Sequence, residues 1–340
     1  MINRLHIEGF LAGSENALLL DVRSPSEYIQ AHIPGAISFP LFTDEERKVV
    51  GTSYKQESRE NAIKIGLDYF GPRMRPMIEE VEKILNGTDK PIYVHCWRGG
   101  MRSGGVAWLL DLYGFKVSTL EGGYKAFRNW VLKQFLKEYN LMILGGYTGS
   151  SKTELLKHLA FQGHQTIDLE NLANHRGSAL GGIGRPPQPS QEMFENLLAT
   201  ALARHNINKA IWLEDESQRI GDRNIPNDFM AKMRISPLFF LDVPFDKRLD
   251  YLLVEYGSLP TDRVKESILR IKKRLGGLET KNAIQYLEEG NVRRCFEILL
   301  TYYDKFYSKA LTARKAQLKT IETANCDVVT NAELLLKSAN

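Results

Sequence analysis

Residues 95–103 are the stretch best suited to chemistry, because they combine a cysteine with two glycines and two arginines (His-Cys-Trp-Arg-Gly-Gly-Met-Arg-Ser). The apolar run 91–94 before them predicts a buried strand, and the compact apolar segment 104–112 after them predicts a helix. Backbone N–H groups converge in such a strand–loop–helix turn, and the helix N-terminus adds positive potential. We therefore expect a loop that binds an anion and lowers the pKa of its thiol.

Cys96 is the expected catalytic residue, a thiolate that attacks or holds an anionic sulfur, selenium or phosphorus species. The rest of the loop is the expected anion-binding cradle: Trp97, Arg98, Gly99, Gly100, Met101 and Arg102. A buried structural cysteine is one alternative, since free cysteines are often buried, but such cysteines do not usually lie in a Gly-Gly turn between two arginines. A metal ligand is a weaker alternative, because no second cysteine lies near.

A second glycine-rich stretch lies between the apolar segment 141–144, a predicted strand, and the helical segment 154–159. This is the setting of a phosphate-binding P-loop, G-x-x-x-x-G-K-[ST], from which Ser151 departs by replacing the second glycine. Such a loop binds any diphosphate through its amides and its lysine. A glycine turn without a ligand is the alternative. The expected diphosphate-binding residues are Gly146, Gly149, Ser150, Ser151, Lys152 and Thr153.

Three acids, residues 214–216, follow the apolar segment 210–213. They resemble the end of a Walker B strand, which holds Mg²⁺ beside a diphosphate. The candidate Mg²⁺ ligands are Thr153 and Asp215, with Glu214 as the alternative to Asp215. The alternative is that these acids cap the strand and pair with Arg219 and Arg223.

A loop rich in glycine and proline, residues 174–191, separates the P-loop from the acidic segment. Loops of this composition and length commonly carry function, although a single histidine more often has a structural role. From this loop and the acidic segment we expect these substrate contacts: His175, Arg176, Arg185, Glu214 and Asp215.

Beyond residue 244 the sequence is mainly helical, most clearly over 246–256 and 261–275. In the second of these helices four apolar residues recur on one face, which predicts the buried side. They are Val264, Ile268, Ile271 and Leu275. The polar face of this helix is crowded with basic residues that are candidate contacts to nucleic-acid phosphates. They are Arg263, Arg270, Lys272, Lys273 and Arg274. A solvated, charged helix surface is the alternative.

The chain of 340 residues is long enough for two domains. Its net charge of +4 neither requires nor excludes a nucleic-acid partner. The three cysteines lie far apart, so no disulfide framework is expected and a reducing, cytoplasmic setting suits the free thiol. The N-terminus lacks the apolar core of a signal peptide, and no run approaches the ~18 apolar residues of a membrane span, so we expect no membrane partner.

Strands and helices alternate through the first 120 residues, as in one small α/β domain. Ser24, Pro25 and Glu27 predict the capped start of a short helix. The pair Gly122-Gly123 is expected to let the backbone pass close to the Cys96 loop. The expected organisation is a domain at 1–130, a connecting helix at 131–140, a P-loop-like domain at 141–245, and a mainly helical part at 246–340 that packs on the P-loop domain and carries the nucleic-acid contacts.

Several motifs of the N-terminal part resemble the rhodanese (sulfurtransferase) domain over about residues 4–130. They are Asp21-Val22-Arg23-Ser24-Pro25-x-Glu27-Tyr28, His32-Ile33-Pro34-Gly35-Ala36, the Cys96 loop and Glu121-Gly122-Gly123. The Cys96 loop, the insertion at 43–70 and the strings at 174–178, 188–191 and 214–217 resemble the tRNA 2-selenouridine synthase family over nearly the whole chain. The resemblance implies an α/β fold with an N-terminal rhodanese-like domain, a P-loop NTPase-like parallel-sheet domain and a helical C-terminal extension.

The resemblance also implies a two-step exchange on the wobble 2-thiouridine of tRNA. Geranyl diphosphate alkylates the sulfur and releases diphosphate; selenophosphate then supplies selenium and geranylthiol leaves. The P-loop residues would bind the diphosphate, Cys96 would serve selenation, and the basic helix would bind tRNA. The implied substrates are thus geranyl diphosphate, selenophosphate and the 2-thiouridine-containing anticodon loop of tRNA. No tightly bound cofactor is expected, Mg²⁺ is a candidate ion, and a selenophosphate-producing enzyme is a candidate partner.

Two other classes of function remain open at this point. One is a rhodanese-type sulfurtransferase with a regulatory NTPase domain, which would hydrolyse nucleotide without tRNA. The other is a non-catalytic tRNA- or partner-binding protein, against which the presence of Cys96, Lys152 and Thr153 argues.

Overall fold

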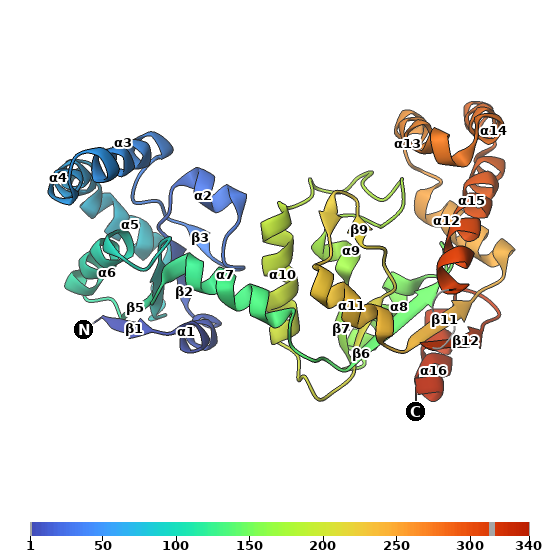
Figure 1. Cartoon of the computed structure of the whole chain (residues 1–340), viewed down its shortest axis with the longest axis horizontal. Coiled ribbons are helices and arrows are strands. Elements are labelled where there is room, and N and C mark those ends of the chain that lie inside the picture. The colour runs from blue at the N-terminus through green and yellow to red at the C-terminus, as the bar shows by residue number, and fades with distance from the viewer. Residues whose placement is uncertain (1, 313–316, 340) are drawn as a thin grey trace. The chain divides into compact units, whose positions relative to one another are not determined.

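The computed structural model describes residues 2–312 and 317–339 and divides the chain into two compact units, Met1–Gln134 and Phe135–Asn340. Each unit is built on a five-stranded parallel sheet with helices, which confirms the expected α/β class (Figure 1). Within the described residues no helix is both long and apolar enough to cross a membrane.

The sheet of the first unit has the strand order β1-β5-β4-β2-β3. Its strands are β1 (Asn3–Leu5), β2 (Leu18–Asp21), β3 (Ile37–Ser38), β4 (Ile92–His95) and β5 (Val117–Leu120). The central strand β4 is buried at every residue, as expected of an apolar run in a parallel sheet that is covered on both faces. Its carboxyl end is where ligands of open parallel sheets bind, and the Cys96 loop begins there.

The helices of the first unit include the expected capped helix and the expected insertion. They are α1 (Ile7–Ser14), α2 (Pro25–Gln30), α3 (Asp44–Gln56), α4 (Arg59–Phe70), a 3₁₀ turn (Gly71–Arg73), α5 (Met74–Leu85), α6 (Met101–Tyr113) and α7 (Gly123–Gln134). Ser24 and Glu27 form the predicted capping box of α2. The inserted helices α3 and α4 lie side by side (Figure 1), and Thr43 and Ser58 cap them.

The helix α7 differs in its bounds from the connecting helix expected at 131–140. It begins at Gly123 and ends at Gln134, and residues 135–140 are not helical. The reason is tertiary packing: Phe135 and Tyr139 leave the helical path to pack against Phe229 of the second unit's own core.

The sheet of the second unit has the strand order β12-β11-β6-β8-β7. Its strands are β6 (Leu141–Gly146), β7 (Gln165–Ile167), β8 (Ile211–Glu214), β11 (Leu238–Asp242) and β12 (Leu318–Glu322), and a separate antiparallel pair consists of β9 (Arg219–Ile220) and β10 (Arg223–Asn224). The P-loop follows the central strand β6, just as the Cys96 loop follows β4.

The helices of the second unit are α8 (Lys152–Phe161), α9 (Leu169–Leu172), α10 (Gln191–Ala203), α11 (Asn227–Ile235), α12 (Phe245–Tyr256), α13 (Thr261–Leu275), α14 (Gly277–Glu288), α15 (Val292–Thr312) and α16 (Val328–Ala339). In α13 the predicted apolar face is confirmed, since Val264, Ile268 and Leu275 are buried. They pack with Leu249 of α12 and Leu299 of α15 in one core cluster. The fourth predicted residue, Ile271, is half-buried at the edge of the same cluster.

The C-terminal part is less purely helical than expected. Its strand β12 pairs in parallel with β11, and α16 contacts both α8 and the sheet. The P-loop-like unit thus extends beyond residue 245 to include this last strand and helix. Of the residues in β12 only Ile321 is buried, so this edge strand lacks the apolar pattern from which a strand is predicted.

Candidate functional site

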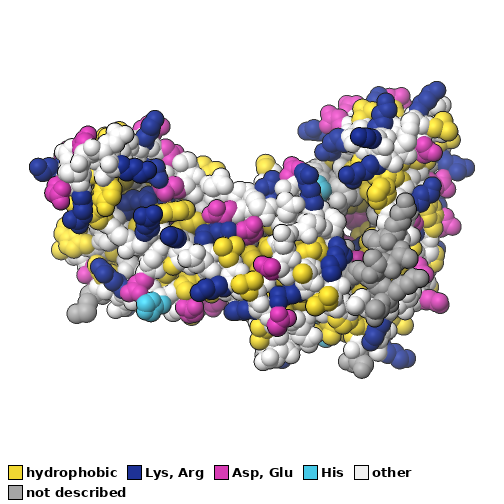
Figure 2. Space-filling model, viewed as in Figure 1, with side chains coloured by type: hydrophobic (Ala, Val, Ile, Leu, Met, Phe, Trp, Pro, Cys, Tyr) yellow, Lys and Arg dark blue, Asp and Glu magenta, His cyan; other side chains and the backbone are white. Residues whose placement is uncertain are grey.

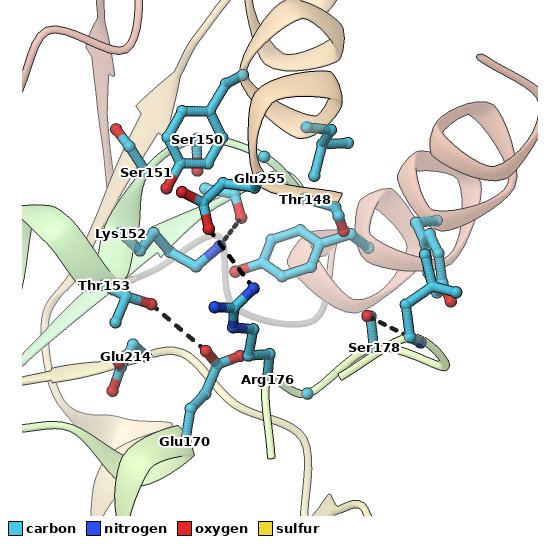
Figure 3. Close-up of a pocket in the computed structure, with 18 of the residues that line it drawn as sticks. Thr148, Ser150, Ser151, Lys152, Thr153, Glu170, Arg176, Ser178, Glu214 and Glu255 are labelled. Atoms are coloured by element: carbon cyan, nitrogen blue, oxygen red, sulfur yellow. Dashed lines mark hydrogen bonds and ion pairs between the residues drawn. The ribbon is translucent and has the colours of Figure 1, made fainter. Parts of the chain in front are cut away.

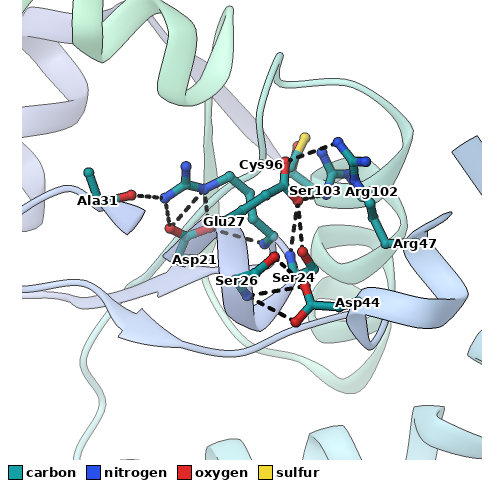
Figure 4. Close-up of polar contacts among 11 residues, drawn as sticks. Asp21, Ser24, Ser26, Glu27, Ala31, Asp44, Arg47, Cys96, Arg102 and Ser103 are labelled. Carbon is teal, nitrogen blue, oxygen red and sulfur yellow. Dashed lines mark hydrogen bonds and ion pairs between the residues drawn. The ribbon is translucent and has the colours of Figure 1, made fainter. Parts of the chain in front are cut away.

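Cys96 directly follows β4, and its side chain is only 3% exposed. Its Sγ lies 3.2 Å from the Oγ of Ser103 in the first turn of α6. Arg102 lies beside it and forms an ion pair with Glu27, with 2.7 Å between Nη1 and Oε2 (Figure 4). Although the thiol borders the hydrophobic core, its immediate contacts are therefore polar.

The loop stabilises the thiolate form of Cys96. Burial by itself raises the pKa of this thiol, but the Ser103 hydroxyl, the positive charge of Arg102 and backbone N–H groups of the loop outweigh burial and lower it. The thiolate is the nucleophilic form of cysteine. These surroundings favour a reactive residue over a structural cysteine.

Two glycines permit the close approach that shapes the loop. Gly99 has a φ of +64°, and a Cβ there would lie 2.4 Å from the carbonyl oxygen of Leu120. Gly123 has a φ of +58°, and a Cβ there would lie 2.3 Å from the carbonyl oxygen of Cys96. The N–H of Tyr124 can then donate to that carbonyl at 2.8 Å. The predicted close passage of the Gly122-Gly123 pair is confirmed.

A buried ion pair lies close to the Cys96 loop. Asp21 and Arg23 form a fully buried ion pair, and the Arg23 guanidinium lies 3.8 Å from the centre of the Tyr124 ring. Burial lowers the pKa of His95 to about 4 against the attraction of Asp21, so this histidine is neutral at pH 7. Around the thiol the remaining predicted cradle residues are exposed: Trp97, Arg98, Gly99, Gly100 and Met101.

The P-loop encloses one side of a pocket of about 450 Å³ in the second unit. All six predicted diphosphate-binding residues line it, and so do four of the five predicted substrate contacts: Arg176, Arg185, Glu214 and Asp215. Lys152 donates through Nζ to the carbonyl oxygen of Gly146 at 2.9 Å. In Figure 3 the side chains of Lys152, Thr153, Glu170 and Arg176 point toward one another.

His175 is the predicted substrate contact that does not line this pocket. Its imidazole ring lies next to Gly182 and Gly221. Burial and the charge of Arg270 lower the pKa of His175, with Asp222 opposing them. The neighbouring Arg176 faces the pocket instead, with Nη1 3.5 Å from Oε2 of Glu255.

Carboxyl groups crowd the floor of the pocket. Glu170 lies 3.4 Å from the Thr153 hydroxyl, and its carboxylate and that of Glu216 fill the space where a side chain on Gly177 would lie. Burial and the charge of Glu170 raise the pKa of Glu216 to about 8, and burial also raises the pKa of Glu170. The string of residues 174–178 therefore needs its glycine to accommodate these acids.

Asp215 pairs with residues other than the arginines expected at 219 and 223. Its carboxylate accepts from Arg234 at 3.0 Å and from the Tyr307 hydroxyl at 2.6 Å, whereas Arg219 pairs with Asp222. Within the described residues, no group of three or more His, Cys, Asp or Glu side chains is placed to hold a metal ion. Mg²⁺ at Thr153 and Asp215 stays a prediction, because the described side chains show no such group and the Asp215 oxygens already accept from Arg234 and Tyr307.

The pocket also has an apolar wall, which was not predicted from the sequence. This wall consists of side chains from α12 and α15, among them Leu252, Tyr256, Phe296, Leu299, Tyr303 and Phe306. These helices follow the P-loop by about a hundred residues or more, so only the tertiary structure brings them to it. Their aromatic residues carry no recognisable motif.

Arg248 is a further residue that the sequence analysis missed. It is buried, donates to the carbonyl oxygen of Thr148 in the P-loop at 3.1 Å, and pairs with Asp304 of α15 at 2.7 Å. This side chain thus connects the phosphate cradle to the helix that supplies the apolar wall.

The predicted phosphate-contacting residues of α13 all lie at the surface, outside the pocket. Lys and Arg side chains gather over α13 and α14 and are interspersed with Asp and Glu (Figure 2). Arg263 pairs with Glu266, and Arg270 donates to Ser267 and to the carbonyl oxygen of Ala179. Lys272 and Lys273 form no ion pair with any residue that the structure describes.

Comparison with known proteins identifies both units. Residues 10–129 match the family model of the rhodanese-like domain, and residues 139–333 match that of the tRNA 2-selenouridine synthase AAA domain. Proteins named tRNA 2-selenouridine synthase are 34% identical in Hydrogenovibrio crunogenus (93% of this chain, 94% of the relative) and 33% identical in Marinobacter nauticus (88% and 90%). The protein of that name from Shewanella frigidimarina is 36% identical over 77% of this chain and 76% of its own length.

Proposed function

The chain belongs to the tRNA 2-selenouridine synthase family, and from this premise we propose that it replaces the sulfur of wobble 2-thiouridine in tRNA by selenium. The reaction has two steps: geranyl diphosphate alkylates the sulfur, and selenophosphate then supplies selenium. The substrate is a tRNA, so the cytoplasm is the proposed location.

One observation supports the alkylation step: the same pocket is lined by the diphosphate cradle and by a group of apolar side chains. Gly146, Lys152 and Thr153 belong to the cradle, and Leu299 and Phe306 belong to the apolar group. Geranyl diphosphate likewise combines a negatively charged diphosphate head with an apolar ten-carbon chain. A pocket of about 450 Å³ is within the usual range of small-molecule sites.

In the first step the thiocarbonyl sulfur of the nucleoside attacks C1 of the geranyl group. The C–O bond to diphosphate breaks, its electron pair leaves with diphosphate, and the proton of N3 is lost. Negative charge grows on the leaving diphosphate, where the P-loop amides and Lys152 are placed to stabilise it. This chemistry needs no γ-phosphate, which is consistent with Ser151 in place of a glycine.

In the second step selenium from selenophosphate adds to C2 of the alkylated base. The C2–S bond breaks, and the sulfur leaves as geranylthiol after taking up a proton. Water cleaves the Se–P bond, phosphate leaves, and N3 regains its proton. The lowered pKa of Cys96 and the nearby Arg102 support a role for this loop in holding or accepting the selenium donor.

Nucleoside mass spectrometry on 2-thiouridine-containing tRNA tests both steps. We expect Lys152→Ala to lower alkylation by geranyl diphosphate at least about a hundredfold, as for loss of a principal charge-stabilising group. We expect Cys96→Ser to retain alkylation, shown by later elution in reversed-phase chromatography, and to lose 2-selenouridine. Lys247→Ala, at an exposed lysine outside the pocket, is the control.

The same assay separates the proposal from its rivals. Selenouridine formation by Cys96→Ser would remove this cysteine from the mechanism. A modification that requires ATP, or nucleotide hydrolysis without tRNA, would instead support a sulfurtransferase with a regulatory NTPase domain.

A further inference from the structure

A second apolar cavity, of about 910 Å³, lies within the first unit beside the Cys96 loop. One wall is the loop itself and the start of α6, including Met101, Ser103 and Trp108. The other wall comes from the inserted helices α3 and α4, including Tyr54 and Leu67.

Large apolar side chains are unusually exposed around this cavity. Tyr54, Leu67, Met101 and Trp108 are each between 50% and 55% exposed, and all four line it. Single exposed apolar residues are ordinary, but a group that lines one concave surface marks a binding site. A ligand with a sizeable apolar part would cover them.

One residue, Ser103, contacts both the cavity and the reactive thiol. Ser103 lines the cavity, and its Oγ lies 3.2 Å from the Sγ of Cys96. Arg102 also lines the cavity and is held in place by Glu27. A ligand in this cavity would therefore have its apolar part against α4 and α6 and its polar end at the anion loop.

The inserted helices are held firmly enough to form a wall. Arg73 binds Glu46 at the start of α3 through two hydrogen bonds of 2.6 and 2.8 Å and also donates to the carbonyl oxygen of Leu41. The Thr43 capping box fixes the same helix start. The insertion thus forms a preformed wall that faces the Cys96 loop.

We propose that this cavity binds the prenyl chain of the S-alkylated nucleoside during selenation. The proposal rests on the proposed function and adds to it a second prenyl site, separate from the one beside the P-loop. With the chain in the cavity, C2 of the base lies at the anion loop, where the C2–S bond breaks. The departing prenylthiol, protonated as it leaves, stays in apolar surroundings.

The test compares two anticodon stem–loop RNAs, one with S-geranyl-2-thiouridine and one with S-methyl-2-thiouridine. Both are incubated with the full-length protein and selenophosphate, and binding and selenation are measured separately. We expect the protein to favour the geranylated RNA at least about tenfold, because only the longer chain fills an apolar cavity. Trp108→Ala and Leu67→Ser should remove most of this preference and leave selenation of the methylated RNA unchanged.

Two comparison variants make the result specific. Leu112→Ala changes an exposed leucine on α6, the helix of Trp108, that does not line the cavity, so it should keep the preference. Phe306→Ala changes the apolar wall beside the P-loop; it should weaken alkylation by geranyl diphosphate but keep the preference for the geranylated RNA.

The outcomes separate this inference from the function on which it rests. Equal binding and selenation of the two RNAs, or a preference that Phe306→Ala removes and Trp108→Ala keeps, would overturn the second prenyl site and leave the two-step reaction standing. Failure to form selenouridine from either RNA would contradict the proposed function. The second prenyl site would still be supported if the protein bound the geranylated RNA preferentially and Trp108→Ala abolished that preference.

Discussion

Ser151 stands where the P-loop pattern has a glycine, and its backbone explains why a glycine is usual there. Its φ and ψ are 52° and 29°, the left-handed conformation that costs a residue with a Cβ about 1 kcal/mol. Its hydroxyl donates to the carbonyl oxygen of Cys326 at 3.3 Å, a weak compensation. The loop therefore keeps the backbone conformation that suits a glycine, and Ser151 adopts it at the cost of strain.

We expect Ser151→Gly to stabilise the second unit by about 0.5–1 kcal/mol, since glycine adopts this conformation without strain. Thermal denaturation should show a rise in Tm of roughly 1–4 °C. Ser150→Gly is the matched control: its φ is negative and its hydroxyl donates to the Tyr147 carbonyl at 2.8 Å. It should lower Tm. A lower Tm for Ser151→Gly would show that the Cys326 contact outweighs the strain.

Glu216 makes the stability of the protein depend on pH. Its pKa is raised from 4.5 to about 8, so between these values the folded protein keeps a proton that the unfolded chain releases. The free energy of unfolding must then fall as the pH rises from about 4.5 to about 8 and level off above it.

Glu216→Gln should reduce this dependence, which Glu170 and Glu214 share because burial also raises their pKa values. At pH 8.5 we expect its Tm to lie a few degrees above that of the parent, and at pH 4.5 to lie close to it. Glu333→Gln, at an exposed position of α16, is the control. If both variants show the parent's pH profile, the acid cluster does not carry the effect.

At the scale of elements, the least predictable piece is the C-terminal strand and helix. β12 carries one buried residue, yet it completes the sheet that positions the P-loop. In α16 the side chain of Leu335 is fully buried against α8, and that of the preceding Leu334 is 36% exposed. Substitutions of these two leucines should therefore differ in their effect on stability if α16 packs against α8.

We expect Leu335→Ala to destabilise the second unit by about 3 kcal/mol and Leu334→Ala by under about 1 kcal/mol, as for buried and half-exposed leucines. Chemical denaturation followed by circular dichroism measures both. Similar small losses for the two variants would mean that α16 does not pack as described.

At the scale of the whole molecule, the proposed function requires a chain of modest net charge to bind a tRNA. Three basic residues of α13 have acidic or backbone partners: Arg263, Lys265 and Arg270. Arg274 contacts the Tyr302 hydroxyl, whereas Lys272 and Lys273 have no ion-pair partner among the described residues. These two lysines are therefore the strongest candidates for phosphate contacts.

We expect Lys272→Glu with Lys273→Glu to weaken tRNA binding about tenfold and to reduce the salt dependence of the binding constant by about one per lost contact. Filter binding at several salt concentrations measures both quantities. Lys116→Glu, at an exposed lysine that pairs with Asp89, is the control. An unchanged salt dependence would place the tRNA on another surface.

The sequence by itself determined the two loops, their order and the family. Cys96 and Lys152 each follow a central parallel strand, because an apolar strand, a glycine-rich turn and a helix are local features that neighbouring residues specify. The buried face of α13 was predictable for the same reason. These features depend on residues only a few positions apart.

Only the tertiary structure decided what surrounds each loop. The apolar wall beside the P-loop comes from α12 and α15, and the cavity beside Cys96 comes from α3 and α4 together with α6. The partners of Asp215 and the docking of β12 also join residues far apart in the chain. Such contacts depend on how helices and strands pack, and packing has no short sequence signature. The loops are therefore predictable from the sequence, whereas the helices packed around them are not.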